Sequence, residues 1–169
     1  MTASFRSYSP APRLTLLVAA GAAAVLGAAL WQQHLGQQPC PLCVLQRIGY
    51  LVVLGGALLA SVLGALGLRA LARAAAALGV LGAAGGLGTA LKHVWLVWHP
   101  GQTCGLDPLA VRIDHWTVTQ WFPWMFRADG FCADVPKVFG VTLPAWSALG
   151  FVVLGGLLAV ALLRRASAR

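Results

Sequence analysis

Four long apolar stretches dominate the hydrophobic pattern of this chain, and polar residues collect in the segments between them. The stretches lie at about residues 14–31, 48–68, 74–96 and 146–163, and each is close to the roughly 20 residues that a helix needs to cross a bilayer. The run from Ile48 to Trp98 is too long for one crossing, so we expect the chain to turn back at residues 67–73. The pattern predicts a single-domain, all-α membrane protein built as a four-transmembrane-helix bundle.

Composition supports this class and excludes two others. Of the 169 residues, 59% are hydrophobic and 9% are charged, and there is no Glu. An ordinary soluble domain has roughly 25% charged residues, so a soluble fold of this size could not cover its surface. Disordered chains are poor in apolar residues, which excludes disorder as well.

The charged residues predict the orientation of the bundle. One side collects seven arginines without any acidic residue, whereas all four Asp fall on the other side. These arginines are Arg6, Arg13, Arg69, Arg73, Arg164, Arg165 and Arg169. Cytoplasmic loops carry the excess of basic residues, so we expect both termini in the cytoplasm and loops of about 32–47 and 97–145 in the periplasm. Topology thus accounts for the net charge of +8, and we expect no nucleic-acid partner.

Two pairs of cysteines are the main candidates for chemistry. Cys40 and Cys43 lie in the first outer loop, and Cys104 and Cys132 lie in the long second one. An even number of cysteines facing an oxidising compartment is typical of disulfides. A bridge between Cys40 and Cys43 would close too short a loop to stabilise the fold much, which favours a redox role for this pair.

The spacing around Cys43 favours it as the reactive thiolate. We expect Cys43 in the first turn of the second helix, where the helix dipole stabilises a negative charge. Arg47 follows four residues later on the same helix face, and a nearby cation also stabilises a thiolate. Cys40 stands between Pro39 and Pro41, so we expect it off the helix and more accessible to a partner.

Other roles for these residues stay open at this point. Arg47 could instead lie at the membrane interface, with its side chain extended so that the charged group reaches water. The four cysteines could also hold zinc or form inert structural disulfides. Structural zinc sites usually repeat a close spacing, whereas 27 residues separate Cys104 from Cys132. We therefore expect no metal.

The second outer loop carries an aromatic, nearly uncharged segment at residues 116–126. Such a segment favours the headgroup region of the membrane over water. Lying flat there, the loop would keep Cys104 and Cys132 within reach of Cys40 and Cys43.

These motifs together resemble the disulfide bond formation protein B family. The likeness rests on Pro-Cys-Pro-Leu-Cys-Val-Leu-Gln-Arg at residues 39–47, on one early and one late cysteine in the second outer loop, and on Gly-Phe-Cys-Ala-Asp at residues 130–134. Leu-Pro-Ala-Trp at residues 143–146, at the head of the last span, is similar to the end of the family pattern. The resemblance covers essentially the whole chain. Gln46 stands where some members have an acidic residue.

The resemblance implies an enzyme of the bacterial inner membrane, a thiol:quinone oxidoreductase. It would reoxidise a periplasmic DsbA-like dithiol oxidase through a Cys104–Cys132 disulfide, with Cys104 forming the mixed disulfide. The Cys40–Cys43 disulfide would reoxidise that pair, and the Cys43 thiolate would pass electrons to ubiquinone or menaquinone. By the same resemblance, Arg47 would hold the quinone. His93 matches a position near the quinone in the family. The alternative for His93 is a histidine at the membrane interface that binds no ligand.

Two other functions remain as alternatives. A quinone-linked disulfide generator of the vitamin K epoxide reductase type also has a CxxC in a small helical bundle. Its loop cysteines precede the CxxC, whereas here they follow it. A non-catalytic four-span protein with structural disulfides would show no redox turnover and no requirement for Arg47.

Overall fold

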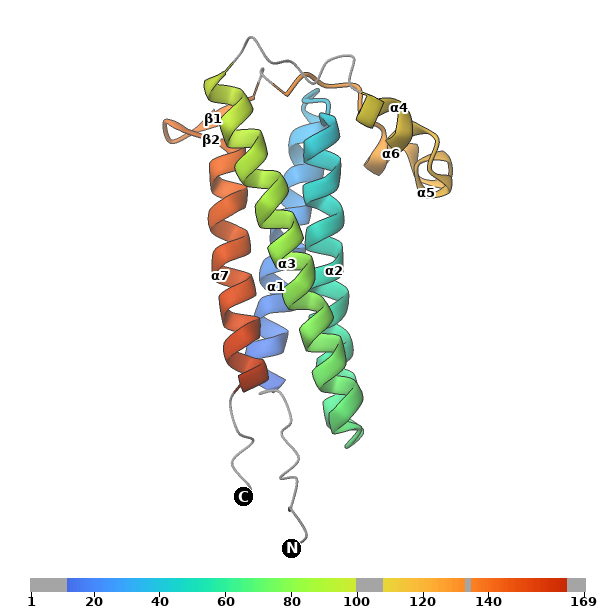
Figure 1. Cartoon of the computed structure of the whole chain (residues 1–169), viewed down its shortest axis with the longest axis vertical. Helices are drawn as coiled ribbons and strands as arrows, with labels where there is room; N and C mark the ends of the chain where they lie inside the picture. Colours follow the sequence, from blue (N-terminus) through green and yellow to red (C-terminus); the bar gives the residue numbers. More distant parts are fainter. Residues whose placement is uncertain (1–11, 100–107, 133–134, 164–169) are drawn as a thin grey trace, which may run out of the picture.

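Four long helices run side by side in a computed structural model that describes residues 12–99, 108–132 and 135–163 (Figure 1). They are α1 (Pro12–His34), α2 (Pro41–Ala65), α3 (Arg69–Trp98) and α7 (Leu143–Leu163), and each is long and apolar enough to cross a membrane. The predicted four-helix architecture is therefore confirmed. Helix α1 begins and α7 ends at the same end of the bundle, opposite the short elements. The cytoplasmic location of the termini stays a prediction.

Each helix begins before the apolar stretch that indicated it, whereas α2 ends at Ala65, three residues before the predicted end of its stretch. The largest difference is at α2, which begins at Pro41 rather than near residue 48. Proline at the first helical position suits a helix start because its missing N–H would have no partner there. The segment between α1 and α2 is consequently shorter than the predicted loop of 32–47. Helices α2 and α3 are joined by a tight turn in which Gly67 has a φ of +76°, a conformation that favours glycine.

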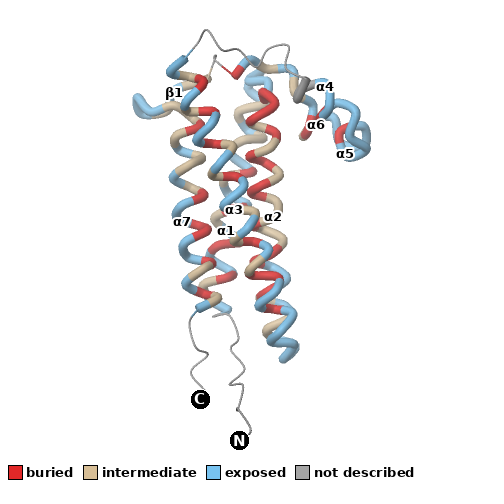
Figure 2. The backbone as a smooth tube through the Cα atoms, in the orientation of Figure 1, coloured by how far each residue is buried: buried red, intermediate tan, exposed pale blue. Residues whose placement is uncertain are grey.

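Close backbone contact holds α2 against α3. A methyl group added at Gly56 would lie 2.7 Å from the carbonyl oxygen of Ala75 and 2.8 Å from Cα of Gly79. Small residues allow helices in lipid to approach this closely. The rings of Tyr50 and Phe151 stack with centroids 4.0 Å apart, joining α2 to α7. Buried residues follow the inward sides of the four helices (Figure 2).

The remaining elements gather at one end of the bundle (Figure 1). Three short helices are α4 (Pro108–Asp114), α5 (Thr117–Trp121) and α6 (Pro123–Phe126). A hairpin of β1 (Lys137–Val138) and β2 (Val141–Thr142) leads into α7, with Val138 paired to Val141. Trp121 and Trp124 are exposed, and the placement of this segment against the headgroups stays a prediction.

Candidate active site

Cys40 and Cys43 lie at the N-terminus of α2, and the local backbone explains their approach. Cys40 is the N-cap residue in an extended conformation, and its Sγ accepts a hydrogen bond of 3.3 Å from the backbone N–H of Cys43. Both cysteines are free thiols, and Sγ of Cys40 donates to Sγ of Cys43 at 2.9 Å. The predicted position of Cys43 in the first turn is confirmed. The two sulfurs need only a small movement to form a disulfide.

The expected accessibility of Cys40 is wrong. Cys40 is only 2% exposed because it packs with Cys132, Leu42 and Leu96, whereas Cys43 is half-buried. The hydrogen bond that its thiol donates to Cys43, and then burial, raise the pKa of Cys40 above its ordinary value. Cys40 is therefore held as a protonated thiol beside Cys43. The sequence suggested exposure because two prolines flank Cys40, but it gave no sign of the segment that covers it.

The covering segment contains Cys132 and is fixed next to the motif by its backbone. The N–H of Gly130 donates to the carbonyl oxygen of Pro39 at 3.0 Å. A methyl group at Gly130 would collide with the backbone of Gln38 and Cys40, so this approach requires glycine. Cys132 itself is disulfide-bonded. Cys104 lies outside the described residues, so its pairing stays a prediction.

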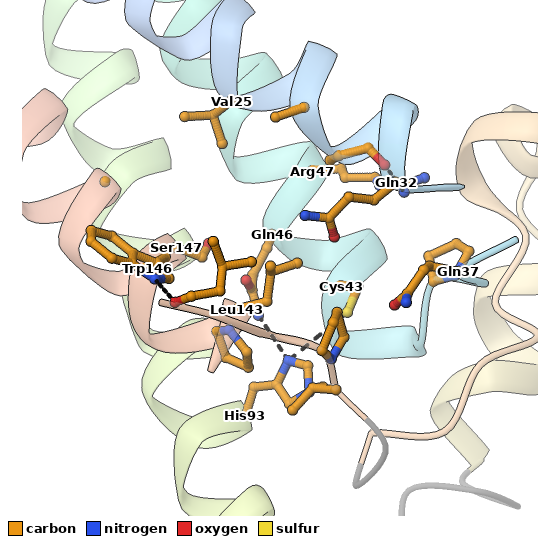
Figure 3. Close-up of a pocket in the computed structure, with 18 of the residues that line it drawn as sticks. Val25, Gln32, Gln37, Cys43, Gln46, Arg47, His93, Leu143, Trp146 and Ser147 are labelled. Atoms are coloured by element: carbon orange, nitrogen blue, oxygen red, sulfur yellow. Dashed lines mark hydrogen bonds between the residues drawn. The ribbon is translucent and has the colours of Figure 1, made fainter. Parts of the chain in front are cut away.

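His93 on α3 lies beside Cys43 and Gln46 (Figure 3), and it also contacts the backbone of the Cys132 segment. The residue has no exposed surface, and its Nε2 lies 3.1 Å from the carbonyl oxygen of Cys132. Since a carbonyl only accepts, Nε2 carries the proton and donates. Nδ1 is then free to accept from the Gln46 amide nitrogen at 3.2 Å. The ring also lies near both sulfurs, with Nε2 at 3.8 Å from Cys40 and Nδ1 at 4.0 Å from Cys43.

Arg47 is buried in a network that sequence reasoning missed. Its Nη1 donates to Oε1 of Gln33 at 2.7 Å and to the carbonyl oxygen of Met125 at 2.8 Å. Its Nη2 donates to the carbonyl oxygen of Ala29 at 3.3 Å. Gln33 in turn donates to the carbonyl oxygen of Trp124 at 2.6 Å. Arg47 and Gln33 thus attach α6 to α1 and α2.

A cavity of about 610 Å³ opens beside the motif, between α1 and α7 (Figure 3). Cys43, Gln46, Arg47 and His93 line its polar part. The rest of its wall is mostly apolar and includes Leu149 and Val153, which are exposed on the outside of the bundle. An apolar cavity with a few convergent polar groups is typical of a small-molecule site. These exposed apolar residues indicate that the cavity opens to the outer surface of the helix bundle.

Comparison with known proteins assigns the family. A sequence model described as "Disulfide bond formation protein DsbB" matches residues 11–161. The chain belongs to the DsbB family. It is 36% identical over 154 residues to disulfide bond formation protein B of Burkholderia pseudomallei (strain 1106a), covering 90% of this chain and 89% of that one. Identity to the Ralstonia nicotianae protein of the same name is 40% over 152 residues, covering 89% and 92% of the two chains.

Membership of the DsbB family confirms the resemblance drawn from the motifs. The chain is a membrane protein of disulfide bond formation and a disulfide oxidoreductase. The non-catalytic and vitamin K epoxide reductase-like alternatives are therefore set aside. The roles of individual residues stay predictions. For this DsbB family member, the structure brings together Cys40, Cys43, Cys132 and His93, with Arg47 on the same cavity.

Proposed function

We propose that this chain is a thiol:quinone oxidoreductase of the bacterial inner membrane that reoxidises a periplasmic DsbA-like dithiol oxidase. One observation carries the proposal: the Cys40–Cys43 pair lies between Cys132 on one side and the cavity on the other. Cys40 packs against Cys132, and both Cys40 and Cys43 line the cavity. This placement suits a pair that receives electrons from a protein disulfide and releases them into a lipid-accessible site.

The disulfide exchanges conserve electrons at each step. A thiolate of the partner attacks the Cys104–Cys132 disulfide at Cys104, and the partner's second thiol resolves the mixed disulfide, leaving Cys104 and Cys132 reduced. These two cysteines then reduce the Cys40–Cys43 disulfide and are reoxidised themselves. Two hydrogen bonds support this second exchange because they position Cys132 next to Cys40. One runs from the Gly130 N–H to the Pro39 carbonyl oxygen, and the other from His93 to the Cys132 carbonyl oxygen.

The cavity fits a quinone by size and by the character of its lining. Its volume of about 610 Å³ lies within the roughly 300–1,000 Å³ common for small-molecule sites. Arg47 and His93 would hold the polar head, and apolar residues of α1 and α7 would contact the remainder. When bound, the quinone would supply the acceptor for two electrons. The chain contributes the half-buried Cys43, the guanidinium of Arg47 fixed by its hydrogen bonds, and a largely apolar wall.

The arrangement of charged and aromatic residues supports cysteines on the periplasmic side. Arg69 begins α3 at the end remote from the cysteines, and Arg73 follows one turn later. Trp95 and Trp98 lie at the other end of the same helix. Basic residues favour the cytoplasmic side, and tryptophan favours an interface. We infer from this asymmetry that both termini are cytoplasmic and that the second loop is periplasmic.

The test follows quinone absorbance with purified protein in detergent, using two electron donors. A reduced thioredoxin-fold oxidase reports the complete route, and dithiothreitol reports direct reduction of Cys40–Cys43. Cys43→Ser is expected to abolish quinone loss with both donors. Cys132→Ser is expected to abolish it with the protein donor but to retain it with dithiothreitol. Quinone loss that persists in Cys43→Ser would refute the proposed electron exit, and no loss in the unsubstituted protein would refute the activity.

A further inference from the structure

The reduced site places three metal-binding side chains together at the N-terminus of α2. The sulfurs of Cys40 and Cys43 and a ring nitrogen of His93 all lie within 4.8 Å of one another. We propose that Cys40, Cys43 and His93 form a binding site for a thiophilic divalent cation such as Zn²⁺ whenever both thiols are reduced. This site differs from a four-cysteine zinc site because its third ligand is His93 on α3 rather than the cysteines of the second loop. It goes beyond the proposed electron transfer and does not depend on quinone binding.

The positions of the ligand atoms are close to those that zinc requires. Tetrahedral zinc has bonds of about 2.3 Å to sulfur and about 2.0–2.1 Å to nitrogen, which puts two sulfur ligands about 3.8 Å apart and sulfur about 3.6 Å from nitrogen. The sulfurs here are 2.9 Å apart, and Nδ1 of His93 lies 4.0 Å from Sγ of Cys43. Side-chain movements of about 1 Å would therefore complete the coordination. A fourth position would remain for water.

His93 is already oriented as a metal ligand. Zinc-bound histidines usually donate their second ring N–H to a carbonyl or a carboxylate, which fixes the ring and its tautomer. Here Nε2 donates to the carbonyl oxygen of Cys132 at 3.1 Å, which leaves the lone pair on Nδ1, the ring nitrogen 4.0 Å from Sγ of Cys43. The Gln46 amide, which now donates to Nδ1 at 3.2 Å, would have to turn away. No change of the helices is required.

Charge balance favours the ion in this buried position. Zn²⁺ binds both cysteines as thiolates, so any proton on either sulfur is released to water and no electron moves. The complex of two thiolates and a neutral histidine with Zn²⁺ has no net charge. Neutral groups avoid most of the cost of burying charge. A Cys40–Cys43 disulfide has no thiolate to offer, so the ion and the disulfide compete for the same two sulfurs. Bound Zn²⁺ would hold the pair reduced and out of the redox cycle.

The test uses a Cys104→Ser/Cys132→Ser background, so that Cys40 and Cys43 are the only thiols. The reduced protein is titrated with Zn²⁺ against a chromophoric chelator under anaerobic conditions. We expect one Zn²⁺ per reduced chain and none after Cys40–Cys43 is oxidised. His93→Ala is expected to weaken binding at least roughly 10–100-fold, the loss typical even of outer-shell partners. His99→Ala is the matched control, since His99 is exposed near the end of α3 and stacks on Trp95, and it should leave the affinity unchanged.

X-ray absorption of the zinc-loaded background protein provides a readout that needs no histidine variant. The expected spectrum contains two sulfur ligands and one imidazole. Absence of Zn²⁺ binding to the reduced protein would overturn the proposal. A spectrum without imidazole, or equal affinity in a folded His93→Ala protein, would also overturn it, because the ligand set would then be wrong.

Discussion

The contact between the Cys132 segment and the CxxC motif can be tested by adding a single methyl group. In Gly130→Ala the new Cβ would collide with backbone atoms of Gln38 and Cys40, which cannot move aside as a flexible side chain would. Alanine keeps the backbone N–H that donates to the carbonyl oxygen of Pro39, so the cost comes from the collision of the methyl group. Overpacking of this kind destabilises the docked position of the segment by about 1–3 kcal/mol.

The consequence is greater exposure of Cys40, which the docked segment buries to 2%. The assay measures the alkylation rate of Cys40 in the fully reduced protein by peptide mass spectrometry. Since about 1.4 kcal/mol corresponds to a tenfold change, Cys40 should react roughly 5-fold to 150-fold faster in Gly130→Ala. Gly88→Ala is the matched control, because its methyl meets nothing within 4 Å. A change of less than about threefold, under 1 kcal/mol, would show that this contact does not bury Cys40.

Three further predictions concern the cavity, the thiol pair and the helix packing. Arg47→Ala should raise the apparent quinone KM by about tenfold or more, since a hydrogen bond to a charged group contributes about 1.5–3 kcal/mol; an unchanged KM in steady-state quinone kinetics would contradict the role given to Arg47. The raised pKa of Cys40 keeps its thiol protonated to higher pH. A plot of the Cys40 alkylation rate against pH should therefore show no inflection near the ordinary pKa of 9.0 in the native reduced protein, but should show one in the denatured protein. An inflection near 9.0 in both would refute the hydrogen-bonded thiol. Gly56→Ala should lower the stability to thermal unfolding in detergent by about 1–3 kcal/mol through overpacking, whereas Gly55→Ala, where nothing lies within 4 Å, should not; equal stability of the two variants would argue against the close contact of α2 with α3.

The four helices could be predicted because lipid sets both the length and the apolar character of a crossing segment. Their ends could not be, because hydropathy stops where polar residues begin, whereas α2 continues through Gln46 and Arg47 to Pro41. Those two polar residues are buried within the protein and have hydrogen-bond partners there. A hydropathy pattern measures exposure to lipid and carries no information about such partners.

The candidate site was predictable to the extent that it depends on short-range spacing. The CxxC at a helix start and Arg47 one turn later are visible in the sequence. The contacts of Arg47 with Met125 and of His93 with Cys132 are not, because both acceptors are backbone carbonyls. Every residue has such a carbonyl, so no residue type indicates these bonds. Gln33 was missed for a related reason, since its amide donates to a backbone carbonyl oxygen of α6, that of Trp124.

Cys40 and Cys43 both line the cavity and both pack near Cys132, but they differ in exposure. The Cys132 segment covers Cys40, which is 2% exposed, whereas Cys43 is half-buried. A protein partner therefore has no direct access to Cys40 while the Cys132 segment is docked, which supports the proposal that the partner reacts first with the loop cysteines. Because His93 contacts both the Cys132 backbone and the two sulfurs, docking of the loop and the geometry of the CxxC pair depend on the same side chain.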